Sequence, residues 1–221
     1  MTLIAIDVKN GTMIADRASF TSGFVRETYT EKIFRVTIRG VPVICGFTGN
    51  FSDVPNMLSF LTECCPAGEP DPERVRAYKK ILNGSGCLFT LCDTTRLNEA
   101  FGLEPSESEQ AVYGKPKYSL ILTEVDEDDD SEAIHVFRYV CLHSSSPLAG
   151  ALFRSRLSSS SSCSEIVLQE AMAELHKSGF DSVGFGWIVD SLERQAKGDY
   201  PILVKLPYRF SESEPVLPKI E

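Results

Sequence analysis

The chain has 221 residues, of which 43% are hydrophobic and 24% are charged, and these proportions are typical of a soluble globular protein. Its length suits one large domain, and a formal net charge of −9 argues against nucleic acid or an anionic membrane as the main partner. No segment has the pattern of a signal peptide, and no apolar run is long enough to span a bilayer. We therefore expect a soluble, cytoplasmic protein with residues 1–221 in a single domain.

The cysteines and histidines form no metal-binding pattern. The chain has seven cysteines and three histidines, without a CxxC pair or an HExxH segment. Cys64 and Cys65 are adjacent, which is a poor spacing for zinc ligands. We therefore expect reduced thiols, no metal site and no cofactor.

The chain opens with an apolar hairpin. Asn10-Gly11 lies between the apolar, β-branched runs 2–8 and 12–17, and this dipeptide is a strong short-range hairpin signal. Because the first strand begins at once, residue 2 is held against a sheet. If Met1 is removed, Thr2 carries a free α-amino group beside its hydroxyl, and the amine can then act as the base that activates the hydroxyl as a nucleophile.

The rest of the chain alternates between paired strands and paired helices. Apolar residues at alternating or continuous positions predict extended segments at residues 24–36, 41–47, 87–91, 118–125, 133–141, 183–189 and 202–206. Helical spacing of apolar residues, together with capping and breaking residues, predicts helices at residues 51–65, 71–82, 147–157 and 166–177. This order favours an α+β fold with mostly antiparallel sheets and helix pairs outside them, followed by a loose tail at residues 211–221.

Three further residues are candidates for chemistry near Thr2. Asp16 ends the second hairpin strand, which returns the chain to its start, and Lys32 lies in an otherwise apolar extended stretch. The pKa of such a lysine would be tuned by a neighbouring carboxylate, and the lysine could help to deprotonate a hydroxyl. Gly49 follows a buried strand and opens a helix, so its N–H could stabilise an oxyanion. The simpler interpretations are an ordinary Asp16–Lys32 ion pair and an ordinary turn glycine.

Together these residues resemble a known family, the N-terminal nucleophile (Ntn) hydrolases of the proteasome β-subunit group. In character they are closest to the bacterial and phage proteasome-like peptidases, including the HslV type. The resemblance rests on Thr2, Asp16-Arg17-Ala18-Ser19, Glu31-Lys32-Ile33 and Gly46-Phe47-Thr48-Gly49-Asn50. It implies that Thr2, Asp16, Lys32 and Gly49 are catalytic.

Two later segments match the family less well. Ser144 would be the serine that supports the nucleophile's amine, but the glycines that flank it in the family are missing. Asp181 would be the catalytic aspartate before a late strand, but Val183 stands where the family has a serine or threonine before Gly184. Residues 93–116 are longer than the family pattern and are predicted to be an insertion.

The resemblance also implies an architecture and a function. The fold would be a four-layer αββα sandwich, and the chain would form a homo-oligomeric ring around an enclosed chamber. Its substrates would be polypeptides, fed to the chamber by a partner ATPase unfoldase in some members of the group. Phe34, Phe47 and Phe51 lie where the family's primary specificity pocket is lined, which would favour apolar residues before the cut.

Two alternatives remain open. The chain could be a catalytically silent structural subunit of a ring, with the same fold but without peptidase activity. It could also be an Ntn amidohydrolase that acts on a small amide. The leading interpretation is a threonine peptidase, and it depends on removal of Met1.

Overall fold

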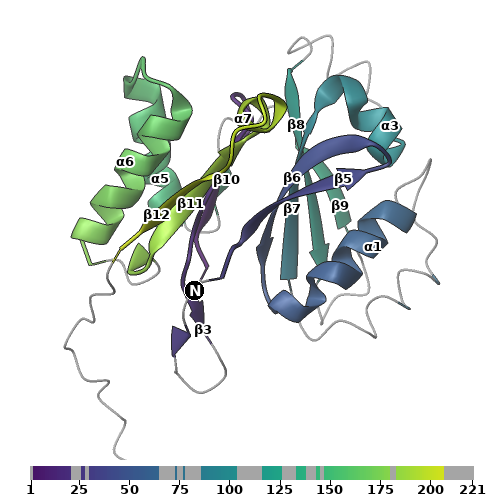
Figure 1. Ribbon diagram of the computed structural model, residues 1–221, viewed down its shortest axis with the longest axis horizontal. Coiled ribbons are helices and arrows are strands. Elements are labelled where there is room, and N and C mark those ends of the chain that lie inside the picture. Colours follow the sequence, from purple (N-terminus) through teal and green to yellow (C-terminus); the bar gives the residue numbers. More distant parts are fainter. Residues whose placement is uncertain are drawn as a thin grey trace, which may run out of the picture.

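The computed structural model describes residues 2–20, 26–27, 30–64, 73, 77, 86–103, 116–125, 133–137, 143–144, 147–179 and 183–206 (Figure 1). All strand pairings in these residues are antiparallel. They form two five-stranded sheets and a two-stranded ribbon of β3 (Ser19–Phe20) and β4 (Arg26–Glu27). The expected α+β class with antiparallel sheets is confirmed.

The first sheet contains the N-terminal hairpin at its centre. Its strand order is β10 (His143–Ser144), β1 (Ile4–Asp7), β2 (Thr12–Asp16), β11 (Gly186–Ser191) and β12 (Ile202–Lys205). Every residue of β1, β2 and β11 is buried, which explains why the sequence there is apolar at nearly every position rather than alternating.

The second sheet follows the order of the sequence. Its strands are β5 (Ile33–Ile38), β6 (Val41–Thr48), β7 (Gly86–Asp93), β8 (Tyr118–Val125) and β9 (Ala133–Phe137). Neighbouring strands are therefore joined as a simple meander, with longer connections only after β6 and β7.

Two pairs of helices lie on the outer faces of the two sheets (Figure 1). Two of them, α5 (Pro147–Ser159) and α6 (Ser164–Lys177), cover the first sheet, and α1 (Val54–Cys64) and α3 (Leu97–Phe101) cover the second. The 3₁₀ turns η1 (Phe51–Asp53) and η2 (Thr94–Arg96) lead into α1 and α3. The short helix α7 (Leu192–Ala196) follows β11 directly. No helix among the described residues is long and apolar enough to cross a membrane.

Three separate clusters of buried side chains correspond to this arrangement. The cluster between the sheets includes Ile4, Ile6, Met13, Ile44, Leu91 and Leu120. The cluster under α5 and α6 includes Leu3, Ile14, Phe153, Leu168 and Met172. The cluster under α1 and α3 includes Val43, Phe47, Met57, Leu61 and Phe101. Successive residues of β1 and β6 thus point alternately into two different clusters, because side chains along a strand alternate between its two faces.

Two glycines permit close packing where a side chain would not fit. A Cβ on Gly46 would lie 2.5 Å from Sδ of Met13, so glycine lets β6 approach β2 across the space between the sheets. Gly186 has φ +94°, and a Cβ there would lie 2.1 Å from the carbonyl oxygen of Val204 in β12. Gly186 therefore fixes the start of β11 against its neighbour.

The sequence predicted most of the longer elements at nearly the right bounds, but it missed the two-residue strands β3 and β10 and two short helices, and it predicted one extended segment at residues 24–36 where the structure has β4 and β5. Both unpredicted helices, α3 and α7, have only five residues, which is too short for helical periodicity to appear. Residues 97–101 of the expected insertion 93–116 are the helix α3, while residues 104–115 lie outside the described residues. The helix expected at residues 71–82 is described only at residues 73 and 77, both helical, and the tail from residue 211 lies outside the described residues.

Candidate active site

The central feature of the site is a buried ion pair that joins the two sheets. Nζ of Lys32, just before β5, lies 2.9 and 2.8 Å from the two carboxylate oxygens of Asp16, at the end of β2. Asp16 is fully buried and Lys32 is 4% exposed. The structure therefore brings together the two charged residues that the sequence singled out.

The carboxylate of Asp16 is also bonded to the backbone next to Thr2. Its Oδ1 accepts the N–H of Leu3 at 2.6 Å, and its Oδ2 accepts the N–H of Ala18 at 2.9 Å. The backbone N–H of Asp16 donates to the carbonyl of Leu3 at 2.9 Å. Leu3 is thus held by both the main chain and the side chain of residue 16, and Thr2 is placed at this end of the first sheet.

Burial changes the pKa values of both members of the pair. Loss of solvent lowers the pKa of Lys32, although the charge and hydrogen bonds of Asp16 oppose this shift. Loss of solvent raises the pKa of Asp16, opposed by Lys32 and by the N–H groups of Leu3 and Ala18. A lysine whose pKa is lowered gives up a proton more readily, which suits a group that exchanges protons with a neighbouring hydroxyl or amine.

Gly49 lies at the same end of the second sheet, directly after β6. It is exposed and has φ +126°, a conformation that favours glycine. The next residue, Asn50, caps η1, since its side chain accepts the N–H of Ser52 at 3.2 Å. Two residues before Gly49, the N–H of Phe47 in β6 donates to the carbonyl of Lys32 at 3.1 Å. The backbone is therefore held by hydrogen bonds both before Gly49, at Phe47, and after it, at Asn50.

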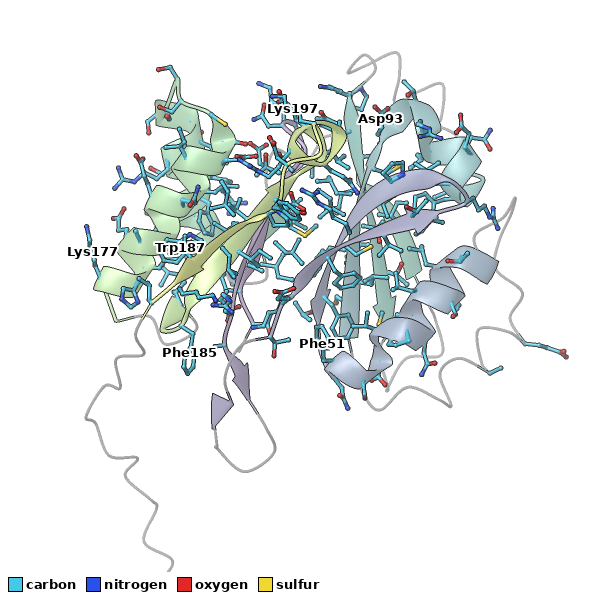
Figure 2. The ribbon with its side chains drawn as sticks, viewed as in Figure 1. Phe51, Asp93, Lys177, Phe185, Trp187 and Lys197 are labelled. Atoms are coloured by element: carbon cyan, nitrogen blue, oxygen red, sulfur yellow. The ribbon has the colours of Figure 1, made fainter. Side chains whose placement is uncertain are left out.

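The three phenylalanines predicted to line a specificity pocket differ in exposure. Phe47 is 2% exposed and belongs to the core under α1, and Phe34 is partly buried against the same core. Phe51 is 44% exposed, and its ring meets that of Phe47 edge to face with centroids 6.2 Å apart. Figure 2 shows Phe51 at the lower end of the second sheet. Of the three, Phe51 offers the largest accessible apolar surface.

The remaining predicted residues are less well defined. Ser144 lies in β10, and its backbone pairs with β1 opposite Ala5. Asp181 lies outside the described residues. Val183, just before Gly184, is fully buried in the core under α5 and α6, and its carbonyl is 3.2 Å from Nδ1 of His176.

Sequence reasoning missed a second ion pair between the sheets. Nε and Nη2 of Arg35 in β5 each lie 2.7 Å from a carboxylate oxygen of Asp190 in β11. The signal was available: Arg35 is two residues from the inward-facing Ile33, and Asp190 is two residues from Ile188, so strand alternation places both charges between the sheets. Each charge, considered singly, looks like an exposed strand residue.

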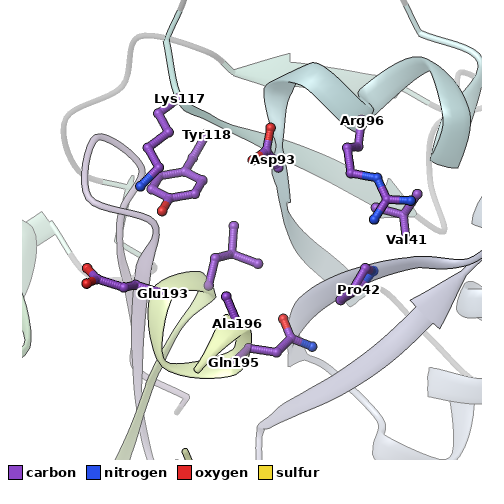
Figure 3. A pocket seen from close by; sticks show the side chains of 10 residues that line it. Val41, Pro42, Asp93, Arg96, Lys117, Tyr118, Glu193, Gln195 and Ala196 are labelled. Carbon is purple, nitrogen blue, oxygen red and sulfur yellow. The ribbon is translucent and has the colours of Figure 1, made fainter. Parts of the chain in front are cut away.

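One open crevice among the described residues lies away from the site. It has a volume of about 310 Å³ and is lined by the start of β6, the end of β7, the start of β8 and α7 (Figure 3). Figure 3 shows Tyr118 and Lys117 facing Glu193 of α7 across it. Asp93, which also lines it, lies at the upper end of the second sheet in Figure 2, opposite the end that carries Phe51. None of the predicted site residues lines this crevice.

This arrangement of sheets and helices is the proteasome-like fold of two solved structures, both of proteins named Anbu. Anbu (ancestral beta-subunit) from Yersinia bercovieri is 13% identical, with a TM-score of 0.53 and coverage of 97% of this chain and 89% of that one. The Gly-1 mutant of Anbu from Hyphomicrobium sp. strain MC1 is 9% identical, with a TM-score of 0.52 and coverage of 92% and 87%. At these identities the likeness concerns the fold.

A eukaryotic HslV from Trypanosoma brucei has a TM-score of 0.44 and 14% identity over 86% of this chain and 98% of that one. No family model and no curated protein matches the sequence.

Proposed function

We propose that the chain is a threonine-type endopeptidase in which Thr2 becomes the N-terminal nucleophile after removal of Met1. The observation that carries this proposal is the buried Lys32–Asp16 pair, whose carboxylate also holds the N–H of Leu3 at 2.6 Å. A charged pair of this kind is costly to bury, and here it lies at the end of β2, beside Leu3 and close in sequence to Thr2. Functional sites are where such perturbed groups concentrate.

In the proposed reaction, the Thr2 hydroxyl oxygen attacks the carbonyl carbon of the scissile peptide bond. The hydroxyl proton passes to the Thr2 α-amine, with Lys32 assisting the transfer. The N–H of Gly49 stabilises the negative charge that develops on the carbonyl oxygen. The C–N bond then breaks, the departing amine takes up the proton, and Thr2 is left as an ester.

Water completes the cycle in the second half of the reaction. The Thr2 amine accepts a proton from the water molecule as its oxygen attacks the ester carbonyl. The C–O bond to Thr2 breaks, and the hydroxyl recovers its proton. Asp16 keeps Lys32 in place throughout, and Ser144 and Asp181 would support the amine. No metal or cofactor takes part in these steps.

The proposal extends to the assembly. The layer order α5–α6, first sheet, second sheet, α1–α3 would be the αββα sandwich of the Ntn hydrolases. The chain would form a homo-oligomeric ring in the cytoplasm that degrades polypeptides inside a chamber, with an ATPase unfoldase as a candidate partner. Phe51 would contact the side chain before the cut, with Phe34 and Phe47 behind it, so apolar residues would be preferred there.

A silent ring subunit is the second candidate, and one observation favours it. Val183 occupies the position where related enzymes carry a serine or threonine, and its fully buried side chain belongs to the core. A site that lacks this hydroxyl would be weaker or inactive.

Intact-mass measurement separates the two candidates. The purified chain is measured with and without a threonine-directed β-lactone, beside Thr2→Ala and the exposed-threonine control Thr37→Ala. The peptidase predicts loss of one methionine mass and one covalent adduct, both in wild type and in Thr37→Ala, with no adduct in Thr2→Ala. A chain that keeps Met1 and takes no adduct would establish the silent subunit.

Cleavage of short peptides tests the specificity. Peptides with an aromatic, a basic or an acidic residue before the cut are compared, using wild type and Phe51→Ala. The aromatic peptide should be cleaved fastest by wild type, and Phe51→Ala should reduce that advantage. Equal rates for the three peptides would rule out the proposed role of the phenylalanines.

A further inference from the structure

Two ion pairs of the described residues cross the space between the sheets. One is Lys32–Asp16, and the other is Arg35–Asp190. The space between them is otherwise filled by apolar side chains of the core that the sheets share. Apolar contacts fix no unique distance or angle, because they have no direction. The relative position of the sheets near the site is therefore specified most sharply by these two pairs.

The Arg35–Asp190 pair has the geometry of a rigid link. Nε and Nη2 of Arg35 form parallel hydrogen bonds of 2.7 Å to the two oxygens of Asp190. Asp190 is fully buried, and its Oδ1 also accepts the N–H of Ser191 at 2.9 Å. A planar guanidinium bound to a carboxylate through two bonds sets both distance and orientation.

The strand register places this link close to the site. Arg35 lies three residues after Lys32 along the same segment. Asp190 lies three residues after Trp187, which is paired directly with Asp16 across β2 and β11. At about 3.3 Å per residue, the two ion pairs lie roughly 10 Å apart along the same seam.

Stability alone does not account for the link. A buried ion pair gives little net stability, since loss of hydration offsets most of the attraction, and apolar residues of similar volume often serve as well. What the link provides, and apolar residues would not, is a fixed separation between β5 and β11. Lys32 and Asp16 depend on that separation, because they belong to opposite sheets.

We propose that Arg35 and Asp190 are positioning residues, whose ion pair holds β5 at the distance from β11 that places Lys32 against Asp16. The inference rests on the proposed peptidase function. It concerns residues that touch neither substrate nor the reacting atoms in that mechanism.

The test replaces the whole link with apolar residues. Arg35→Met with Asp190→Leu should leave the circular dichroism spectrum and melting midpoint close to those of wild type. It should lower kcat by about tenfold or more and change KM by less than about twofold. The reason is that the substitutions displace Lys32 relative to Asp16 but leave the surface that binds the substrate in place. The matched control is Arg194→Met with Glu165→Met, which removes the 2.8 Å ion pair between α7 and α6 within one half of the molecule and should retain wild-type kcat.

A second readout does not require activity. Ala18 lies outside the strands, and its N–H donates to Asp16 Oδ2 at 2.9 Å. The hydrogen-exchange rate of this N–H therefore rises if the carboxylate of Asp16 moves away from it. Exchange at Ala18 should quicken by about tenfold in the double variant, while the N–H of Gly102, bonded to the carbonyl of Asn98 at the end of α3, should keep its rate.

The outcomes separate this inference from the proposed function. Wild-type kcat, or an unchanged Ala18 exchange rate in the folded double variant, would overturn the positioning role. If wild type itself has no activity, the proposed function fails, and the Ala18 exchange alone decides the positioning role. If the double variant does not fold, Arg35→Lys decides: it keeps the charge without the two parallel bonds and should show the same changes to a smaller extent.

Discussion

Leu3 and Asp16 are bonded to each other twice, once through the main chain and once through the carboxylate, which accepts the Leu3 N–H at 2.6 Å. The residue that follows the proposed nucleophile is thereby attached to the residue that holds the proposed proton carrier. Any change at Asp16 acts on both. A substitution at Asp16 that keeps the hydrogen bond to Leu3 but removes the negative charge therefore tests the role of the charge separately from the role of the hydrogen bond.

Asp16→Asn should abolish the proposed peptidase activity and destabilise the fold. The amide oxygen can still accept the Leu3 N–H, but Lys32 loses its counter-charge in a buried site, at a cost of about 3–5 kcal/mol. Adding Lys32→Met should recover much of the stability, since no buried charge is then left unpaired, but none of the activity. Urea denaturation and peptide cleavage measure the two effects. A single Asp16→Asn variant with wild-type kcat would refute the role of the pair.

Gly49→Ala should lower kcat far more than it lowers stability. At φ +126° a Cβ costs about 1–3 kcal/mol, and relief of this strain would rotate the N–H away from the oxyanion. Loss of one oxyanion donor costs about 10²–10³ in kcat. Gly40→Ala is the matched control, because Gly40 also has a positive φ, +81°, but lies in the turn at the opposite end of the β5–β6 hairpin. Equal loss of activity in both variants would contradict the assignment.

The Glu165–Arg194 pair predicts a specific dependence of stability on pH. Burial alone would raise the pKa of Glu165, but hydrogen bonds from Arg194 and Ser191 and the charge of Arg194 outweigh it and lower this pKa below its usual value. Since the pKa is lower in the folded chain, the contribution is complete above the unfolded pKa and is lost as pH falls through the folded pKa. Glu165→Gln should therefore be less stable than wild type at pH 7, and the difference should vanish in acid. Urea midpoints across this range would show it, and a difference independent of pH would argue against it.

Thiol reactivity should separate Cys163 from Cys45 and Cys92. Burial raises the pKa of Cys45 and Cys92 to about 12, so almost no thiolate forms at neutral pH, whereas Cys163 is exposed. Iodoacetamide at pH 8 should modify Cys163 first, and Cys45 and Cys92 only after unfolding. Peptide mapping by mass spectrometry identifies each site. Modification of Cys45 as fast as Cys163 in the folded chain would contradict the buried core.

The parts of the site that sequence could predict are those carried by local pattern. Asn10-Gly11 predicts the hairpin, and the hairpin alone returns Asp16 to the start of the chain, where the structure has it. The lysine in an otherwise apolar segment identified Lys32 as a candidate, and the structure buries it, with 4% of its surface exposed. These predictions needed only the short-range geometry of one hairpin and one strand.

The parts that sequence could not predict depend on contacts between distant strands. The Arg35–Asp190 pair joins residues 155 positions apart, and nothing near either residue identifies its partner. The place of Ser144 against β1 likewise depends on the pairing of β10 with β1, which brings together strands from opposite parts of the chain. Long-range pairing of this kind is set by the whole packing of the two sheets, so strand alternation can place each charge between the sheets but cannot identify its partner.

The last strand of the first sheet has a consequence for how the chain behaves before it is fully folded. In the described residues β12 ends the sheet, and its exposed Leu203 and Lys205 alternate with the half-buried Ile202 and Val204. Without Lys205, residues 202–206 would be an uninterrupted apolar segment at a sheet edge, the kind of segment that pairs with other chains and aggregates. Lys205 interrupts it with a charge, so the edge that closes the sheet in the folded protein is also protected against aggregation while the protein folds.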